Sequence, residues 1–150
     1  MDLNQLPTLK ETIPPMLALM DAVRHELSRQ VPATLPWRWV DEFSSGGCEE
    51  GGTRLYFPGY YSDHAFSEEQ WAQVLPAVTA LAADAGLTGS SVGPMEKPGN
   101  HDVSFTSGDG RKLRFGSRYA TLVTAYVGCR RPGDDLWVDG RIPMPPDPQP

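Results

Sequence analysis

The stretch His101–Cys129, HDVSFTSGDGRKLRFGSRYATLVTAYVGC, decides the fold of this 150-residue chain. Apolar and polar residues alternate around Val103–Phe105, again around Leu113–Phe115, and over the longest run from Tyr119 to Val127. Alternation with a period of two is typical of a strand that buries one face and leaves the other in water. The stretch therefore predicts three sequential antiparallel strands, the first two of which are joined by the turn Ser107–Gly110.

A helical pattern near the N-terminus can cover the buried face of such a sheet. We expect Thr12 to cap this helix, which carries Pro14 and Pro15 in its first turn and ends before Pro32. Arg24 is predicted to face mostly outward. The apolar stripe recurs at helical spacing and consists of Met16, Met20, Val23, Leu27 and Val31.

A second helix has the clearest local signature in the chain. Ser67 and Gln70 are spaced as a capping box, and Gly86 is placed to end the helix. Pro76 interrupts the pattern about two turns in, on a side that we expect to face solvent. The buried stripe is predicted to contain Trp71, Val74, Leu75, Val78, Leu81 and Ala85.

Shorter strands complete the sheet. Trp37–Phe43 and Thr53–Phe57 are predicted strands, separated by a loop at Ser44–Gly52. We expect the residues from Tyr60 to His64 to connect the second of them to the second helix, and Leu87–Met95 to form a weak edge strand. The fold class is thus α+β, with two layers: an antiparallel sheet of about five to six strands and two helices on one face, in the order α-β-β-α-β-β-β-β.

One domain accounts for most of the chain. We expect residues 1–11 to form an N-terminal tether, residues 12–138 a single α+β domain, and residues 139–150 a C-terminal tail. The last nine residues, IPMPPDPQP, contain five prolines and so exclude helix and central strand. This tail is predicted to be extended, either free or lying on the surface.

Charge and composition limit the partners. The net charge is -6 and the pI about 4.9, so the long-range field repels phosphate backbones, and we expect no nucleic-acid partner. No apolar stretch approaches the roughly 18 residues of a spanning helix. Met1–Lys10 lacks the basic start and apolar run of a signal peptide. We therefore expect a cytoplasmic protein, unless a signal peptide has been removed.

Cys48 and Cys129 are the two cysteines. Both lie beside glycines at expected strand ends, whereas inert free cysteines are more often found in the middle of a core strand. This placement favours a disulfide over two unrelated free thiols.

A series of features follows in a fixed order along the chain. They are Val31–Pro32, the strand Trp37–Phe43, Cys48, the helix start Phe66–Gln70, the alanine-rich helix end Ala82–Gly86, the strands Val103–Phe105 and Lys112–Phe115, Ala120–Leu122 leading to Gly128–Cys129, and Pro143–Pro150. In this order and spacing, over residues 16 to 150, the chain resembles the LppA-type lipoproteins of mycobacteria and related actinobacteria. The resemblance implies a secreted, lipid-tethered domain of the cell envelope with Cys48 and Cys129 oxidised. Such a domain meets the membrane only through a lipid anchor that is absent from this chain, and the resemblance implies no activity.

Two pairs of residues carry the candidate acid–base chemistry, Asp63 with His64 and His101 with Asp102. Adjacent residues of an extended chain point to opposite faces, so a zinc site or an active site needs both pairs to converge. Their spacing matches no known zinc motif, and no serine nucleophile motif is present. We therefore expect no catalytic residue, no metal site and no cofactor.

A binding surface is the remaining candidate site. Basic residues gather along the predicted strands from residue 111 onward in an otherwise acidic chain, and aromatic residues lie on the earlier strands. The candidate residues are Trp37, Trp39, Tyr56, Tyr60, Tyr61, Arg111, Arg114 and Arg118. We expect a non-enzymatic extracytoplasmic binding or interaction domain for an unknown protein or cell-envelope component. The alternatives are an inhibitor or immunity-type protein against a toxin or hydrolase and, less favoured, a small metal-dependent enzyme.

Overall fold

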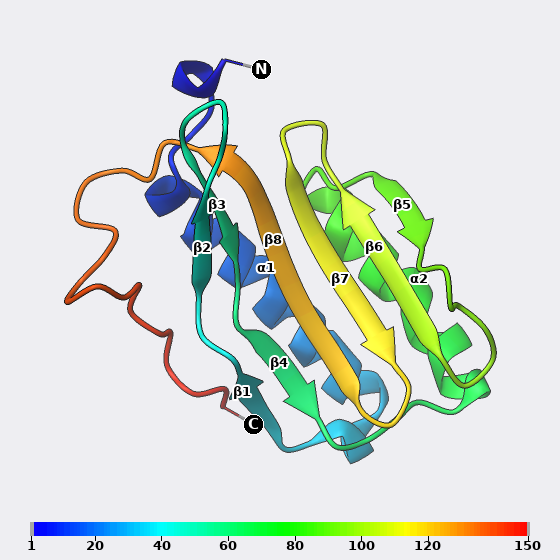
Figure 1. Cartoon of the computed structure of the whole chain (residues 1–150). Coiled ribbons are helices and arrows are strands. Elements are labelled where there is room, and N and C mark those ends of the chain that lie inside the picture. Colours follow the sequence, from blue (N-terminus) through cyan, green and yellow to red (C-terminus); the bar gives the residue numbers. More distant parts are fainter. Residues whose placement is uncertain (1, 150) are drawn as a thin grey trace.

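The computed structural model describes residues 2–149. Figure 1 shows one antiparallel sheet with helices α1 (Leu9–Gln30) and α2 (Glu68–Asp84) packed on the same face. This confirms the two-layer α+β class. The strands are β1 (Trp37–Val40), β2 (Ser44–Gly47), β3 (Thr53–Tyr56), β4 (Gly59–Ser62), β5 (Gly89–Val92), β6 (His101–Thr106), β7 (Arg111–Ser117) and β8 (Thr121–Arg130), with short 3-10 helices at Leu3–Gln5 and Pro32–Thr34.

Strand β8 is central to the sheet. The strand order of the sheet is β1-β4-β8-β7-β6-β5. Strand β3 also pairs with β8, and β2 pairs with β3. One edge of β8 pairs with β7, and the other edge pairs first with β4 and then with β3. Val123, Ala125 and Val127 are buried toward the helices, because alternate side chains of a strand share a face. The three strands predicted from the alternating pattern are confirmed as β6, β7 and β8.

The sheet has eight strands instead of five or six because β2 and β4 follow the two predicted N-terminal strands as additional strands. Asp41, with a left-handed φ of 65°, separates β1 from β2, and Pro58 separates β3 from β4. The predicted loop at Ser44–Gly52 was partly wrong, since Ser44–Gly47 pairs with β3. The prediction that Tyr60–His64 only connects the second strand to the second helix was also wrong at its start. Residues 60–62 belong to β4, because the edge of β8 offers partners to their backbone hydrogen-bonding groups.

Helix α1 begins four residues earlier than predicted, since its N-cap is Thr8 and not Thr12. Thr8 is its N-cap and forms a capping box with Glu11, while the Thr12 hydroxyl donates to the Thr8 carbonyl. Leu9 is fully buried. The predicted tether therefore ends before Thr8, because its last residues carry the cap and the first core contact of the helix.

Helix α2 begins as predicted. Ser67 and Gln70 form the capping box, and Pro76 faces solvent. Gly86 adopts a φ of +91° just after the helix, a conformation that glycine reaches without a steric penalty. The backbone N–H groups of Gly86 and Leu87 donate to carbonyls of the last turn and end the helix there.

The core continues past the predicted domain boundary at residue 138. Leu136 and Ile142 are both buried among the core residues. Residues 143–149 form no regular secondary structure and lie against the edge strand β1 (Figure 1), where they receive hydrogen bonds from Trp39 and Arg24. Of the two expected arrangements for the tail, the structure shows the one on the surface.

A disulfide joins Cys48 to Cys129, with a Cα–Cα distance of 6.3 Å. It ties the turn between β2 and β3 to the end of β8 and closes a sequence separation of 81 residues. This confirms the pairing expected from the sequence.

Replacing both cysteines by serine should lower the free energy of unfolding by roughly 2–5 kcal/mol, because the unfolded chain is no longer restricted by the long covalent loop. Urea denaturation of the oxidised protein and the double variant measures the difference. The wild-type chain under reducing conditions is the control and should approach the variant. Equal stability of all three samples would contradict a stabilising role of the disulfide.

Replacing Thr8 or Ser67 by alanine should each lower the free energy of unfolding by about 1 kcal/mol, because each removes a helix N-cap. Thr79→Ala is the matched control: Thr79 lies within α2, and its hydroxyl donates to the Leu75 carbonyl one turn earlier. That variant should be neutral or slightly stabilising. A loss equal to that of the cap variants would show that removal of any helical hydroxyl suffices.

Candidate functional site

The residues predicted to form a binding surface lie on both faces of the sheet. Cross-strand partners share a face, and Trp39 pairs with Tyr60, which is buried under the helices. Tyr61 and Tyr56 point to the opposite face, away from helices α1 and α2. The residues of the predicted surface therefore form two separate sites, because successive side chains of a strand point to opposite faces of the sheet.

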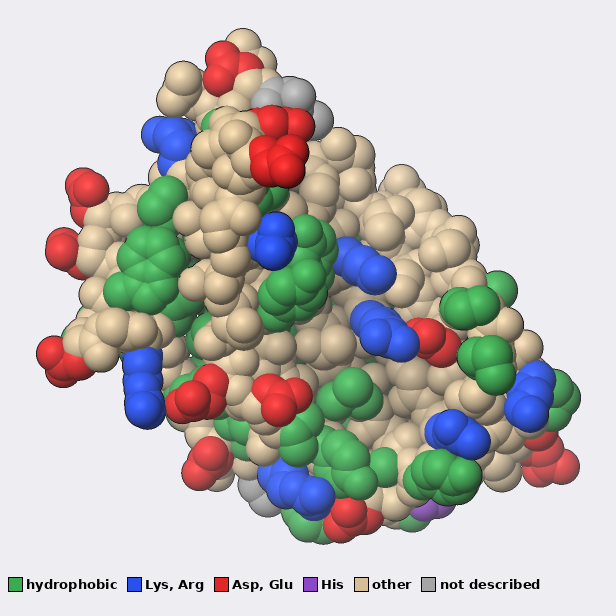
Figure 2. Space-filling view, in the orientation of Figure 1, with side chains coloured by type: hydrophobic (Ala, Val, Ile, Leu, Met, Phe, Trp, Pro, Cys, Tyr) green, Lys and Arg blue, Asp and Glu red, His purple; other side chains and the backbone are tan. Residues whose placement is uncertain are grey.

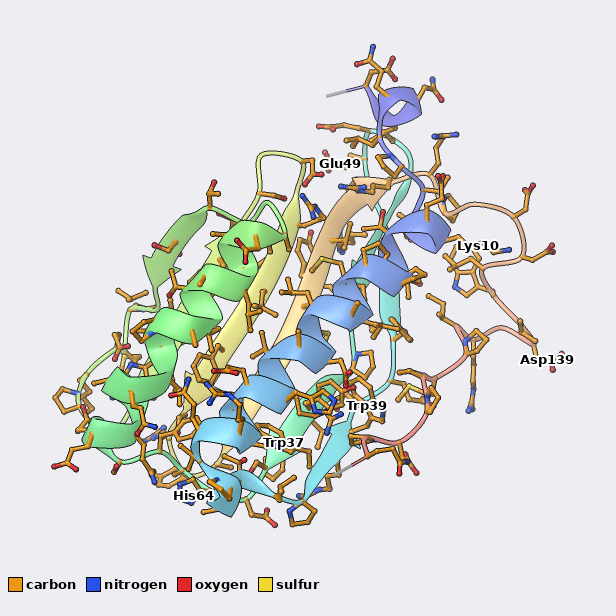
Figure 3. The ribbon with its side chains drawn as sticks, turned by 180° about the vertical axis from the view of Figure 1, so that it is seen from behind. Lys10, Trp37, Trp39, Glu49, His64 and Asp139 are labelled. Atoms are coloured by element: carbon orange, nitrogen blue, oxygen red, sulfur yellow. A yellow bond between two sulfur atoms is a disulfide. The ribbon has the colours of Figure 1, made fainter. Side chains whose placement is uncertain are left out.

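The two tryptophans belong to the helix side. Trp37 is buried, and its indole N–H donates to the Ser28 hydroxyl at 2.7 Å. Trp39 stacks on Tyr60 with ring centroids 3.9 Å apart. Figure 3 shows Trp39 between α1 and the C-terminal segment. Trp37 thus serves the core, whereas Trp39 is only half-buried and faces the tail.

The uncovered face of the sheet carries a hollow of about 420 Å³. Tyr56, which is 50% exposed, lies 4.8 Å from Tyr126 between ring centroids and forms the aromatic part of this hollow. Figure 2 looks onto this face and shows hydrophobic and basic side chains gathered over the middle of the sheet. The lining residues are Asp41, Tyr56, Phe57, Lys112, Arg114, Thr124, Ala125 and Tyr126. We call this the outer hollow.

Only one of the three predicted arginines reaches the outer hollow. Arg114 lies on its rim. Arg111 shares the helix-side face of β7 and donates to Asp109 and to the Ala85 carbonyl, both at 2.9 Å. Arg118 lies in the turn after β7, over the ring of Tyr119. The alternation of β7 explains this division, because residues 112 and 114 face outward whereas 111 faces inward.

Arg114 is held by a carboxylate on the same face. Its guanidinium donates two hydrogen bonds to Asp102, at 2.9 and 2.8 Å. These bonds outweigh partial burial and hold the pKa of Asp102 below its ordinary value. Among residues 2–149, no carboxylate lies within ion-pair distance of Lys112. Lys112 therefore adds a positive charge at the outer hollow, although Asp102 and the lining residue Asp41 supply negative charge nearby.

Sequence reasoning missed Tyr126 and Asp41 at this place, and it included Lys112 in the run of basic residues but not among the candidate site residues. Lys112 and Tyr126 are direct partners across β7 and β8. The register of this hairpin, which follows from the turn at Arg118–Ala120, could have revealed that pair. The position of Asp41 depends on a backbone irregularity that the sequence pattern does not show.

The four candidate acid–base residues have separate partners. Asp63 pairs with Arg38 at 3.3 Å, His64 contacts the amide oxygen of Gln70 at 2.9 Å, and Asp102 pairs with Arg114. Within residues 2–149, no group of three or more His, Cys, Asp or Glu side chains is arranged to hold a metal ion. The convergence required for a zinc site or an active site does not occur among these residues.

His101 lies between two carboxylates that sequence reasoning did not connect with it. Its Nε2 lies 2.8 Å from Glu68 and its Nδ1 2.9 Å from Glu96, and its ring stacks on Trp71 at 4.4 Å. Both ring nitrogens donate only when the imidazole is protonated. Burial by itself lowers the pKa of His101, but the hydrogen bonds to Glu68 and Glu96 outweigh burial and raise this pKa above 6.5.

This cluster links three segments of the chain. Glu68 is in the first turn of α2, Glu96 follows β5, and His101 begins β6. Glu68 also accepts a hydrogen bond from the backbone N–H of Gly99 at 3.0 Å. The hydrogen bonds with His101 and Gly99 lower the pKa of Glu68. The arrangement is suited to holding the β5–β6 loop against α2.

His101→Gln should destabilise the protein most at mildly acidic pH. A raised pKa in the folded state means that the stabilisation by protonated His101 is complete below about pH 6.5 and disappears as the pH rises through the folded pKa. The difference in unfolding free energy between wild type and variant, measured in urea, should thus be larger at about pH 5.5 than at about pH 8.5. His25→Gln, at an exposed histidine of α1, is the control. A difference independent of pH would contradict the charged cluster.

No helix among residues 2–149 has the length and apolar character needed to cross a membrane. No curated protein matches the sequence.

Two solved structures share the fold. The first is a DUF4853 family protein from Actinomyces odontolyticus, with a TM-score of 0.56 and 11% identity over 96% of this chain and 81% of that one. The second is the lipoprotein LppA from Mycobacterium tuberculosis, with a TM-score of 0.57 and 17% identity over 86% of this chain and 82% of that one. At these identities, the likeness shows a common fold.

The sequence also matches a family model over residues 1–133, which covers most of the chain. The model is that of LppA, described as "Lipoprotein confined to pathogenic Mycobacterium". The resemblance noted from the order of sequence features is thereby confirmed, and the chain belongs to the LppA family of lipoproteins.

Proposed function

We propose that the protein is a non-enzymatic binding module of the cell envelope, which holds an anionic envelope component in the outer hollow. The single observation that carries this proposal is the pair of exposed Tyr56 and half-buried Tyr126 beside the positive charge of Lys112, on the sheet face opposite to α1 and α2. Aromatic rings offer contact area at a low entropic cost, and an adjacent cation selects anionic ligands.

The expected location outside the cytoplasm agrees with two independent features. The family is one of lipoproteins. The disulfide between Cys48 and Cys129 suits an oxidising environment, because thiols in the cytosol are kept reduced. A domain tethered at a membrane surface by lipid would meet envelope polymers and proteins, and would need a binding face directed away from its anchor.

The charge on the outer face is opposite to that of the whole chain. Arg38, Arg54, Lys112 and Arg114 project from this face by strand alternation, whereas the net charge of the chain is -6. Asp102 neutralises Arg114 in part, and Arg38 lies over the ring of Tyr61 at 4.3 Å. A local positive region on an acidic protein steers an anionic ligand to one face and leaves the remainder repulsive.

The chemistry of the outer hollow favours binding over catalysis. Asp102, the carboxylate that pairs with the rim residue Arg114, is kept ionised by it, so Asp102 is a poor proton donor near neutral pH. The histidines His64 and His101 have partners on α2 and do not line the outer hollow. The inhibitor-type alternative stays a prediction.

Wild-type protein should co-sediment with isolated cell-wall peptidoglycan, and less protein should be bound as the salt concentration rises. Tyr126→Ala and Lys112→Ala should each weaken the apparent affinity by roughly five- to tenfold, equivalent to about 1 kcal/mol or slightly more. Matched controls remove the same groups outside the outer hollow: Tyr119→Ala, at a residue 81% exposed in the β7–β8 turn, and Lys97→Ala, in the β5–β6 loop.

Two results would contradict the proposal. The first is a wild-type protein that does not sediment with the polymer at low salt. The second is an equal loss of binding in the test and control variants, since general charge or stickiness would then explain the sedimentation. Circular dichroism of each variant establishes that the fold is retained.

A further inference from the structure

The C-terminal segment is held to the domain through its backbone. The indole N–H of Trp39 donates to the Pro146 carbonyl at 2.8 Å, and the guanidinium of Arg24 donates to the Gln149 carbonyl. Ile142, at the start of the segment, is buried in the core. Both hydrogen bonds reach main-chain oxygens, so they recognise the path of an extended chain and not a particular side chain.

The groove under this segment is made of fixed side chains. Trp39 stacks on Tyr60, which is 5% exposed, and the Arg24 guanidinium lies 5.2 Å from the Tyr60 ring centroid. Arg24 itself is 3% exposed and is paired with Asp21 at 2.8 Å. The prediction that Arg24 faces outward was therefore wrong. Asp21 also accepts from the Tyr60 hydroxyl at 3.3 Å, so the four side chains form one connected unit.

The occupant has a specific chemistry. Prolines at positions 143, 145, 146 and 148 restrict this segment to an extended, polyproline-like path and remove backbone donors while leaving carbonyls free to accept. Aromatic-lined grooves recognise such segments, because the rings pack against proline faces and the segment loses little entropy on binding. A stacked Trp–Tyr pair with an indole donor directed at a proline carbonyl has the features of this mode of recognition.

The segment does not fill the groove. A hollow of about 450 Å³ remains between the tail and helix α1. Its walls on the domain side are Leu17, Ala18, Asp21, Arg24, His25 and Tyr60. The site is therefore larger than the ligand that the chain itself supplies, and a longer proline-rich segment has room for further contacts with α1.

We propose that the Trp39–Tyr60–Arg24 groove is a binding site for proline-rich peptide segments, and that residues 142–149 of this chain are its resident ligand. Another proline-rich segment must displace this tail in order to bind. The groove lies on the helix side at the β1 edge, so it is independent of the outer hollow. The failure of either proposal leaves the other intact.

The test uses the full chain and a synthetic peptide of residues 142–150, IPMPPDPQP, that carries a spin label. The double variant Pro145→Gly/Pro146→Gly, which we call the loosened variant, weakens the binding of the tail without shortening the chain, because glycine increases the conformational freedom of the unbound segment. In this variant, the peptide should broaden and shift the indole N–H resonance of Trp39 and bind at least tenfold more tightly than to wild type. The resident tail competes in wild type at an effective concentration in the millimolar range.

Single substitutions separate the donor from the ring stack. Trp39→Phe in the loosened variant keeps an aromatic ring but loses the indole donor, and should weaken peptide binding by roughly two- to tenfold, as expected for one hydrogen bond. Trp137→Phe, at an exposed tryptophan outside the groove, should leave binding unchanged and assists assignment of the indole resonances. A peptide with every proline replaced by alanine should bind more weakly than the native sequence.

Three results would overturn the proposal: no peptide binding by the folded loosened variant, equal binding of the alanine peptide, or broadening that does not involve the Trp39 resonance. If the loosened variant does not fold, titration of wild type with the spin-labelled peptide at millimolar concentration decides the question. Broadening of the Trp39 resonance in that titration supports displacement of the tail, and an unchanged resonance overturns it.

Discussion

The hydrogen bonding of β8 along both of its edges, with one face buried under α1, is the constraint on which the structure depends. A shift of one residue would bring Leu122, Thr124 and Tyr126 under the helix and expose Val123, Ala125 and Val127. The cost of exposing that apolar face fixes the register. Because β7, β4 and β3 all pair with β8, their inner and outer faces are fixed with it.

This register separates two surfaces with different chemistry. On the outer face, Tyr56 and Tyr126 meet Lys112 and Arg114 at a hollow open to solvent. On the helix side, Trp39 and Tyr60 stack where the sheet ends and the C-terminal segment begins to cover it. Neighbouring residues of β4 thus belong to different surfaces, so the aromatic residues of one short stretch cannot act as a single site.

Arginines hold both ends of the chain through backbone carbonyls. Arg130, 1% exposed, donates to the Pro7 carbonyl and to the Thr12 hydroxyl, and Arg131 donates to the carbonyls of Leu3 and Leu6. Arg24 does the same for Gln149. A buried guanidinium is costly unless its donors are paired, and carbonyls of irregular segments need donors in turn. These hydrogen bonds between guanidinium groups and backbone carbonyls explain why the terminal segments follow defined paths without regular secondary structure.

Local patterns were sufficient for much of the fold. Alternation predicted β6, β7 and β8, the Ser67 capping box predicted the start of α2, and the spacing of Met16 and Val23 predicted the buried face of α1. The errors occurred where a partner distant in sequence decides. Ser44–Gly47 is glycine-rich and becomes a strand only because β3 provides its hydrogen bonds. Arginine is a residue type usually found at exposed helix positions, and Arg24 is buried because the tail covers it.

The sequence by itself determined the fold class, the pairing of two cysteines and the family, since these follow from periodicity, from residue type and from the order of features along the chain. Only the tertiary structure decided which aromatic and charged residues act together. His101 meets Glu68 and Glu96, Tyr56 meets Tyr126, and Trp39 meets Pro146 across gaps that no local pattern spans. Such contacts depend on the register and packing of whole elements, and each is fixed only when the sheet and helices are assembled.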